Sequence, residues 1–558
     1  MSEDNADAGQ RGVSLMDASQ QAWGKRGRYL AILGLSLLMI TFELDNTTVN
    51  TFNNYSLSEF GALSALGSLY AAGLIFFAVV KLPLAKLSDV IGRGYTLAIA
   101  VSFYTIPYVL MSTATGAPMY FIGKVLSKIG QSGTNVMTTV IISDITNPRQ
   151  RGLAIGLSYL PFLGTPWVSG LIVESFVKGS GWRWGVGLFA IAMPIGSCLL
   201  IGTLIHYQRK AKQLGFVSSG KATIRSFCSA VDMGGIALFA VGFTMLLLPM
   251  SIAGSLPDGW RTPWVPALIV VGFIVLLGLL AYEKSVATNP LLPASYFKNL
   301  TIVLSMLIMA VDDLGHTATH TYLYAWGTIS YNMSPRDATY FSFTNGVTQC
   351  FAGIIAGWIM YRTGYYKWLT AGGAVVRLIG YGLMFRLRGH QNSIAELFIQ
   401  QFIQGIGSGI IHATLLVPPQ IVVPRAQIAQ ILSLTLSVAF LGKSVGFAIA
   451  GGIYTNTMRP ALWHYLGDNA TQKLVENLYN SITKGVPAWG TAQRDAISLA
   501  YTEVTKSFSY VGVGTSVLAI VMCCFLPNLL LPDGNVTVTG HVIAMGEPEE
   551  THELPEKK

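Results

Sequence analysis

The sequence predicts an all-α integral membrane protein, and three observations lead to that fold class. Apolar residues make up 52% of the 558 residues, whereas charged residues make up only 11%, about half the fraction usual in a soluble chain. Fourteen apolar runs have about the twenty residues that a helix needs to cross a bilayer. The formal net charge is +9, but no basic stripe with interleaved aromatic residues indicates nucleic-acid binding.

The expected spans follow one another along the chain. Because their number is even, both ends of the chain are expected on the same side of the membrane. With the N-terminus in the cytosol, the short inner connections carry roughly eighteen Lys and Arg against roughly six outside, as the positive-inside rule requires. The spans lie near 29–48, 62–84, 95–113, 118–142, 152–176, 184–206, 231–251, 264–282, 300–325, 339–361, 368–386, 394–417, 431–455 and 506–531.

Two segments outside the spans, and the cysteines, also carry expectations. Residues 1–27 are polar and are expected to form a short disordered tail. The five cysteines have no paired spacing, so no disulfide framework or zinc site is expected. The longest outer connection, from about 456 to 506, carries aromatic and leucine residues at irregular helical spacing. It is either a lid over the outer mouth or a loop packed passively against it.

The stretch 81–94 is expected to be a tight turn at the cytosolic surface. Pro83 can end the preceding span, and Gly92 and Gly94 can let the chain reverse. An acid and an arginine in this turn can cap a neighbouring helix and pair with a nearby acid, which would clasp two helix bundles together. An ordinary solvated loop is the alternative.

Motifs in this turn and elsewhere resemble those of a known superfamily. The cytosolic signature Gly-x-Leu-x-Asp-x-x-Gly-Arg of the major facilitator superfamily is matched at Leu87, Asp89, Gly92 and Arg93, and the segment 144–152 resembles its second acid-to-arginine signature. Beyond the superfamily, the chain is similar over nearly all of residues 40–535 to the fungal siderophore iron transporters. That similarity rests on Leu44-Asp45-x-x-Thr48, Ala85-Lys86-x-x-Asp89-x-x-Gly92-Arg93, Asp144-Ile-Thr146, Trp182-Arg183-Trp184-Gly185, Tyr366-Lys367-Trp368, Gln401-x-x-Gln404-Gly405-Ile406-Gly407 and Gln493-Arg494-Asp495-Ala496.

The resemblance implies a major facilitator fold of about fourteen transmembrane helices, in two pseudo-symmetric bundles plus two extra helices. The two bundles would rock about a central site. It also implies an inner gate made of Asp89, Arg93, Asp144 and Arg151. The expected divisions are a cytosolic N-terminal tail (1–27), an N-terminal six-helix bundle (28–207), a basic cytosolic linker (208–230), two linker helices (231–282), the C-terminal bundle helices (283–456), a large extracellular loop (457–505), the last transmembrane helix (506–531) and a cytosolic C-terminal tail (532–558).

Charges inside the first half are candidates for function, because burying each costs a few kcal/mol or more. Glu43 and Asp45 lie near the outer end of the first span, and Lys124 and Lys128 share one face of the fourth at a similar depth. An acid–lysine pair between these two spans is therefore expected. Its role is either proton coupling with ligand binding or a buried structural ion pair.

The ninth span carries the charges of the second half. Asp312, His316 and His320 recur every four residues and form a stripe, with Asp313 beside them. Histidine titrates near neutral pH, which suits a proton relay. A static polar network is the main alternative. Direct metal ligation by the histidine pair and a carboxylate is a third, and no resident metal is assigned.

Aromatic and cationic residues of the second half are the candidates for ligand binding. Tyr322, Tyr324 and Trp326 resemble an aromatic stretch of the siderophore transporters and would stack on the ligand. Arg377 and Lys443, together with the two lysines of the fourth span, would hold its oxygens. Such cations favour an anionic or oxygen-rich ligand, which includes ferric hydroxamates, haem carboxylates, glutathione and organic-acid toxins.

We therefore predict proton-coupled uptake of ferric siderophores by a non-enzymatic monomer without a cofactor. Its partners are the lipid bilayer, protons and a small-molecule chelate, with no nucleic acid. The plasma membrane is expected, with vacuolar and endosomal membranes as alternatives. Proton-driven export of glutathione, a toxin or a drug, haem uptake, and a receptor that does not transport are the competing functions.

Overall fold

The computed structural model describes residues 3–145, 157–158, 160–213, 233–253, 261–285, 294–389, 392–423 and 428–531. These residues form helices and their connections, and no strand occurs among them. Within these described ranges, ten helical stretches are long and apolar enough to cross a membrane, and the apolar helix segment Gly234–Pro249 is shorter. The predicted all-α membrane class is therefore confirmed, whereas the count of fourteen spans stays a prediction.

The first half of the chain forms one bundle. Helix α1 packs against α7, α3 packs against both α4 and α7, and α2 packs against α4. Tyr104 and Tyr108 are fully buried inside this bundle. Its helices are α1 (Glu3–Glu59), α2 (Leu66–Ile91), α3 (Arg93–Ser112), α4 (Ala117–Ile145), α6 (Pro161–Lys178) and α7 (Trp182–Gln213), with the short helix η1 (Leu63–Ala65) before α2.

Two apolar helices follow, α9 (Met233–Ile252) and α10 (Trp264–Ser285). They pack against each other, and α9 also contacts α2 and α18. Large apolar side chains of α10, such as Val270 and Ile274, are more than half exposed, as expected for a helix that faces lipid. This pair therefore lies at the edge of the molecule.

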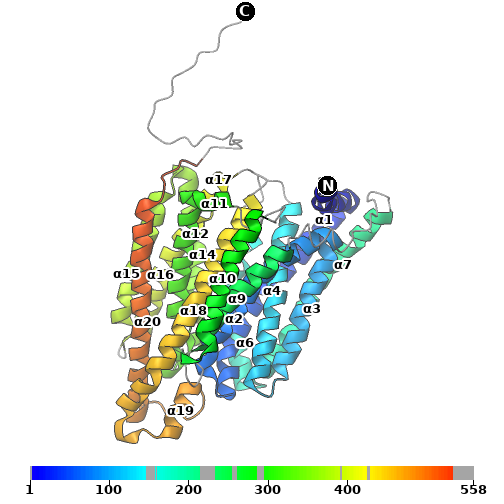
Figure 1. Ribbon diagram of the computed structural model, residues 1–558. Coiled ribbons are helices and arrows are strands. Elements are labelled where there is room, and N and C mark those ends of the chain that lie inside the picture. The colour runs from blue at the N-terminus through cyan, green and yellow to red at the C-terminus, as the bar shows by residue number, and fades with distance from the viewer. Residues whose placement is uncertain are drawn as a thin grey trace, which may run out of the picture.

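The second half forms the other bundle, in which α12 contacts α18 and α20 and α15 contacts α16 and α20. In Figure 1 the start of α1 and the end of α20 lie at one end of the molecule and α19 lies at the other. The elements are α11 (Ala294–Lys298), α12 (Leu300–His320), α13 (Leu323–Ser330), α14 (Pro335–Thr363), α15 (Lys367–Leu387), α16 (Ile394–Leu415), α17 (Pro418–Ile421), α18 (Ile428–Leu466), η5 (Gly467–Asn469), α19 (Gln472–Asn480) and α20 (Ala492–Phe525).

The two bundles meet along two helix pairs, α2 with α18 and α6 with α14. Glycines allow the first pair to approach closely: a Cβ at Gly67 would lie 2.7 Å from the carbonyl oxygen of Phe447 and 3.1 Å from Gly451. The hydroxyl of Ser444 donates to the carbonyl of Ala71 across the same contact, at 3.0 Å. This two-bundle arrangement is the major facilitator architecture that the sequence predicts.

The stretch 81–94 differs from the expected turn. Helix α2 continues through Pro83 to Ile91, and a single residue, Gly92, separates it from α3. Gly92 has φ +96°, which a residue with a Cβ rarely adopts. Gly94 is helical, and a Cβ there would lie 2.8 Å from the side chain of Ile205 in α7. One glycine therefore makes the reversal, and the other allows close helix packing.

The longest extensions of helices beyond the expected boundaries occur at three places. Helix α1 begins at Glu3 within the expected disordered tail, α18 continues to Leu466, and α20 begins at Ala492. The Thr491 side chain caps α20 by accepting from the backbone N–H of Arg494. These extensions interrupt their apolar residues with charged and polar ones, so a criterion of continuous apolar runs misses them. Residues 214–232 of the linker and the tail 532–558 lie outside the described residues.

Candidate functional site

A buried polar cluster lies between α1, α3 and α4 in the first bundle. Asp45 is fully buried, and the Tyr108 hydroxyl donates to its Oδ1 at 2.7 Å. The amide Nε2 of Gln131 donates to Asp45 Oδ2 at 3.2 Å, and the Lys128 ammonium donates to Gln131 Oε1 at 2.5 Å. Gln131 therefore bridges the acid and the lysine that the sequence predicts to pair directly.

The other charges of the first bundle are also buried. The Lys124 ammonium donates to Asn50 Oδ1 at 3.2 Å, and both lysines interact electrostatically with Asp45. Glu43 is only 4% exposed. The structure thus brings the four predicted charges of this half into one region, held by amide and tyrosine side chains that sequence reasoning did not single out.

A second cluster lies in the other bundle, between α12, α15 and α16. Arg377 Nε donates to Asp312 Oδ1 at 2.9 Å, and both side chains are almost fully buried. A second guanidinium nitrogen, Nη1, donates to the carbonyl of Gln404 at 2.8 Å. The Ser408 hydroxyl donates to Asp312 Oδ2 at 2.9 Å. Arg377, predicted to hold the ligand, is therefore occupied by its own bundle in this structure.

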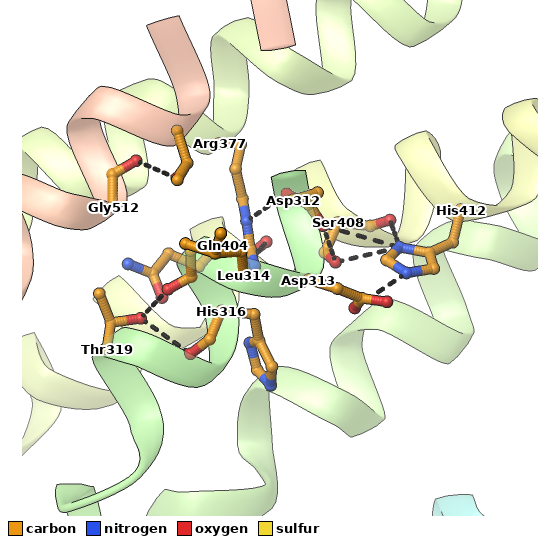
Figure 2. Close-up of polar contacts among 12 residues, drawn as sticks. Asp312, Asp313, Leu314, His316, Thr319, Arg377, Gln404, Ser408, His412 and Gly512 are labelled. Atoms are coloured by element: carbon orange, nitrogen blue, oxygen red, sulfur yellow. Dashed lines mark hydrogen bonds and ion pairs between the residues drawn. The ribbon is translucent and has the colours of Figure 1, made fainter. Parts of the chain in front are cut away.

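His412 of α16 connects this pair to a second acid, as Figure 2 shows. Its Nε2 lies 3.2 Å from Asp313 Oδ1, and its Nδ1 lies 3.7 Å from Asp312 Oδ2. The Lys443 ammonium of α18 lies 3.4 Å from the same Asp313 oxygen. The two acids are therefore linked by one histidine, and each is paired with one basic side chain, Asp312 with Arg377 and Asp313 with Lys443.

Exposure within this second cluster is uneven. The carboxylates of Asp312 and Asp313 are nearly inaccessible, whereas the side chains of His412 and Lys443 are 18% and 29% exposed. The histidine and the lysine thus lie on the accessible side of the cluster. Sequence reasoning missed His412, although a histidine within the apolar run of α16 is a usable signal.

The same residues provide a test of metal binding. Among the described residues, Asp312, Asp313 and His412 have ligand atoms within 4.8 Å of one another. Each carboxylate already pairs with a cation, Arg377 or Lys443. A divalent ion would have to compete with both positive charges, so this arrangement suits proton exchange better than metal binding.

The ring contact and hydrogen bonds of His316 and His320 are made with groups other than the carboxylates of Asp312 and Asp313. Their rings stack with centroids 4.2 Å apart, and His320 Nε2 lies 2.8 Å from Gln401 Oε1. Both the Thr319 hydroxyl and the carbonyl of His316 lie 2.9 Å from His320 Nδ1. The predicted stripe of Asp312, His316 and His320 is therefore divided between two hydrogen-bond networks.

The predicted aromatic residues close one end of the molecule, the end that the sequence predicts to face outward. Tyr322 stacks on Tyr454 with a centroid distance of 4.1 Å and donates to the carbonyl of Ser64 in the first bundle at 3.0 Å. The hydroxyls of Tyr324 and Tyr55 lie 2.7 Å apart across the two bundles. Trp326 is fully buried. In this state these rings therefore pack against protein.

Only part of the predicted inner gate can be placed. Arg93 is buried, and its Nη1 donates to the carbonyl of Ser88 at 2.9 Å, across the break between α2 and α3. The side chains of Asp89 and Asp144 and the whole of Arg151 lie outside the described residues. The gate remains a prediction.

Comparison with known proteins identifies related sequences and folds. The family profile described as Major Facilitator Superfamily matches residues 35–329. A siderophore transporter of Zymoseptoria tritici is 28% identical, covering 95% of this chain and 86% of its own. A low affinity heme transporter of Schizosaccharomyces pombe is also 28% identical, covering 95% and 87%. The crystal structure of a bacterial homolog of the human lysosomal transporter Spinster, inward-facing and occupied, matches with a TM-score of 0.59 at 15% identity, covering 90% of this chain and 97% of that one.

Proposed function

We propose that this chain, which belongs to the Major Facilitator Superfamily, takes up ferric siderophores together with protons. The match to the superfamily covers residues 35–329, and the related transporter of Zymoseptoria tritici is named for siderophores. Similarity over nearly the whole of both chains supports a shared class of ligand. The proposed location is a fungal membrane, the plasma membrane first, and the proposed working unit is the monomer.

The main support for coupling of uptake to protons is the position of His412 between two acids. Its two ring nitrogens face Asp312 and Asp313 at 3.7 and 3.2 Å. A histidine exchanges a proton near neutral pH, and its partial exposure gives that proton access to water. A proton on His412 adds a positive charge beside Asp313, so it weakens the hold of that acid on Lys443.

Protonation of His412 can affect the interface between the bundles through Lys443. Lys443 lies on α18, which packs against α2 of the first bundle. A weaker pair between Asp313 and Lys443 frees the ammonium for the ligand when the proton is bound. Proton binding and ligand binding then favour each other, which is the requirement for symport. His316 and His320 are proposed to extend the proton path toward the outer end.

The first-bundle charges have a proposed place in the same cycle. Asp45 and Glu43 exchange protons, while Lys124 and Lys128 attract the ligand when Gln131 and Asn50 release them. Tyr322, Tyr324 and Trp326 contact the ligand when the outer end opens. Asp89, Arg93, Asp144 and Arg151 close the inner end. Each of these roles is a proposal for mutagenesis.

Transport by purified protein in liposomes tests this function. With acid outside and neutral buffer inside, we expect accumulation of ⁵⁵Fe-labelled ferrioxamine B that a protonophore abolishes. A proton-driven exporter would instead move the chelate against the direction of proton entry. Liposomes without protein and a pH-clamped sample are the controls. Accumulation that ignores the pH gradient would refute the coupling.

Haem uptake is the second candidate, favoured by one of the relatives. The heme transporter of Schizosaccharomyces pombe covers 95% of this chain, and haem carries two carboxylates that buried lysines can bind. Competition between haemin and ferrioxamine B in the same liposomes decides between them. A chain specialised for haem would accumulate haemin and leave the hydroxamate chelate outside.

A further inference from the structure

A lysine of the first bundle lies at the contact between the two bundles. Lys81 of α2 is 9% exposed, and its ammonium donates to Asn135 Oδ1 of α4 at 3.2 Å. It also lies 4.7 Å from the ring centroid of Phe77 and 4.6 Å from that of Phe440. Phe440 belongs to α18, so Lys81 contacts both halves of the molecule.

The lysine of the second cluster contacts the same ring. Lys443 follows Phe440 by about one helical turn in α18, and its Nζ lies 5.4 Å from the centroid of the Phe440 ring. The distance between the two ammonium nitrogens therefore cannot exceed the sum of their distances to the Phe440 centroid, 4.6 and 5.4 Å. At this separation the two positive charges repel each other. Lys81, Phe77, Phe440 and Lys443 define the paired-lysine site.

The charges around the paired-lysine site are unbalanced. Lys443 has Asp313 at 3.4 Å, whereas the contacts of Lys81 within the described ranges are one amide oxygen and two aromatic faces. Cation–aromatic contacts contribute about 0.5–2 kcal/mol each, far less than the cost of a buried ammonium without a counter-ion. An anion placed between the lysines would supply the missing counter-ion of Lys81 and offset the repulsion between the two ammonium groups.

We propose that Lys81 and Lys443 bind an anionic oxygen group of the transported ligand, a carboxylate in particular, between α2 and α18. The inference rests on the proposed function for the remainder of the ligand, the ferric chelate. The lysines come from different bundles, so the anion joins the halves at the surface along which they move. The site therefore selects chelates with a free carboxylate over neutral chelates of the same size.

A matched pair of chelates tests this selection. N-succinyl-ferrioxamine B and N-acetyl-ferrioxamine B share the iron-binding part, and only the succinyl derivative carries a carboxylate. We expect the wild-type protein to prefer the succinyl form by about tenfold in affinity, the amount that one charge-assisted hydrogen bond supplies. The variant Lys81→Met should bring this ratio close to one, and Lys81→Arg should retain most of it.

A control variant and a second readout separate folding from binding. Lys178→Met removes a lysine that is 67% exposed on α6 and should leave the ratio unchanged. Millimolar sulfate, compared with chloride at equal ionic strength, should raise the Tm of the purified wild type and of Lys178→Met. It should have little effect on Lys81→Met. This measurement needs no chelate and no transport.

The outcomes distinguish the inference from the proposed function. If both chelates are transported at equal affinity and sulfate has no effect, the paired-lysine site is refuted and siderophore uptake stands. If neither chelate is transported but sulfate stabilises through Lys81, the site stands and the proposed ligand is wrong. Equal losses of both chelates in Lys81→Met would also overturn the inference, because they indicate a structural role.

Discussion

Buried charges in this chain are compensated within a few ångströms by groups on other helices. Arg377 pairs with Asp312 between α15 and α12, and Tyr108 and Gln131 from α3 and α4 satisfy Asp45 of α1. Lys81 and Arg388 differ, because the contacts of both with other described residues are to neutral groups. At the scale of single residues, function is therefore expected where compensation is incomplete or where a group can titrate.

Removal of Arg377 should destabilise the protein strongly. Arg377→Met leaves Asp312 as an uncompensated buried charge, which costs about 3–5 kcal/mol. We expect a lower Tm in detergent, measured by size-exclusion of heated samples. The double variant Asp312→Asn with Arg377→Met should recover much of the loss. A double variant no better than the single one would show that the pair is not the source of the stability.

Replacement of His412 should flatten the pH dependence of uptake. His412→Gln keeps a polar side chain beside Asp312 and Asp313 but exchanges no proton, so uptake rates should vary several-fold less between pH 5 and 7.5. Exchange of labelled for unlabelled chelate at a fixed pH should persist, which reports a folded and binding-competent protein. His320→Gln, in the network with Gln401, tests the proposed extension of the path: a profile flattened by His320→Gln but not by His412→Gln would contradict the role of His412.

At the scale of helices, glycines set how closely α18 approaches its neighbours. A Cβ at Gly442 would lie 2.2 Å from the carbonyl oxygen of Ala310 in α12, whereas one at Gly452 would meet nothing within 4 Å. Gly442→Ala should therefore lower the Tm, because α12 and α18 must separate. Gly452→Ala, on the same helix, should leave it unchanged. Equal effects of the two substitutions would contradict this packing.

Contacts between the bundles close the structure at the end that holds α19, which the sequence predicts to face outward. Besides the Tyr55–Tyr324 contact, the Ser64 hydroxyl donates to Asn480 at 2.9 Å, and the backbone N–H of Ile482 donates to the Ser58 hydroxyl at 3.0 Å. The segment around α19 thus packs on the first bundle. Opening of this end must break these hydrogen bonds.

Weakening this seal should shift the protein toward an outward-open state. Tyr55→Phe removes one hydrogen bond worth about 0.5–1.5 kcal/mol, which shifts the equilibrium several-fold. Spin labels on the exposed Lys178 and Lys473 report the opening as a larger share of long distances. Tyr510→Phe, on a side chain that is 70% exposed, is the control. An unchanged distance distribution would show that the tyrosine pair does not hold the closed state.

The sequence by itself determined the membrane class, most helix positions and many of the buried charges, although not Lys81, Arg388 or the partly buried His412. Long apolar runs and intramembrane ions are local features, and their cost in lipid makes them readable without a structure. It also located the chain reversal near Gly92, although Pro83 did not end the helix.

Only the tertiary structure decided which charges meet. His412 lies about one hundred residues from Asp312 and Asp313 in the chain, and Lys81 lies several hundred from Phe440, so no spacing rule relates them. Gln131 stands between Asp45 and Lys128, and Arg377 is held by its own bundle. Such pairings depend on helix rotation and crossing, which side-chain packing between distant segments sets.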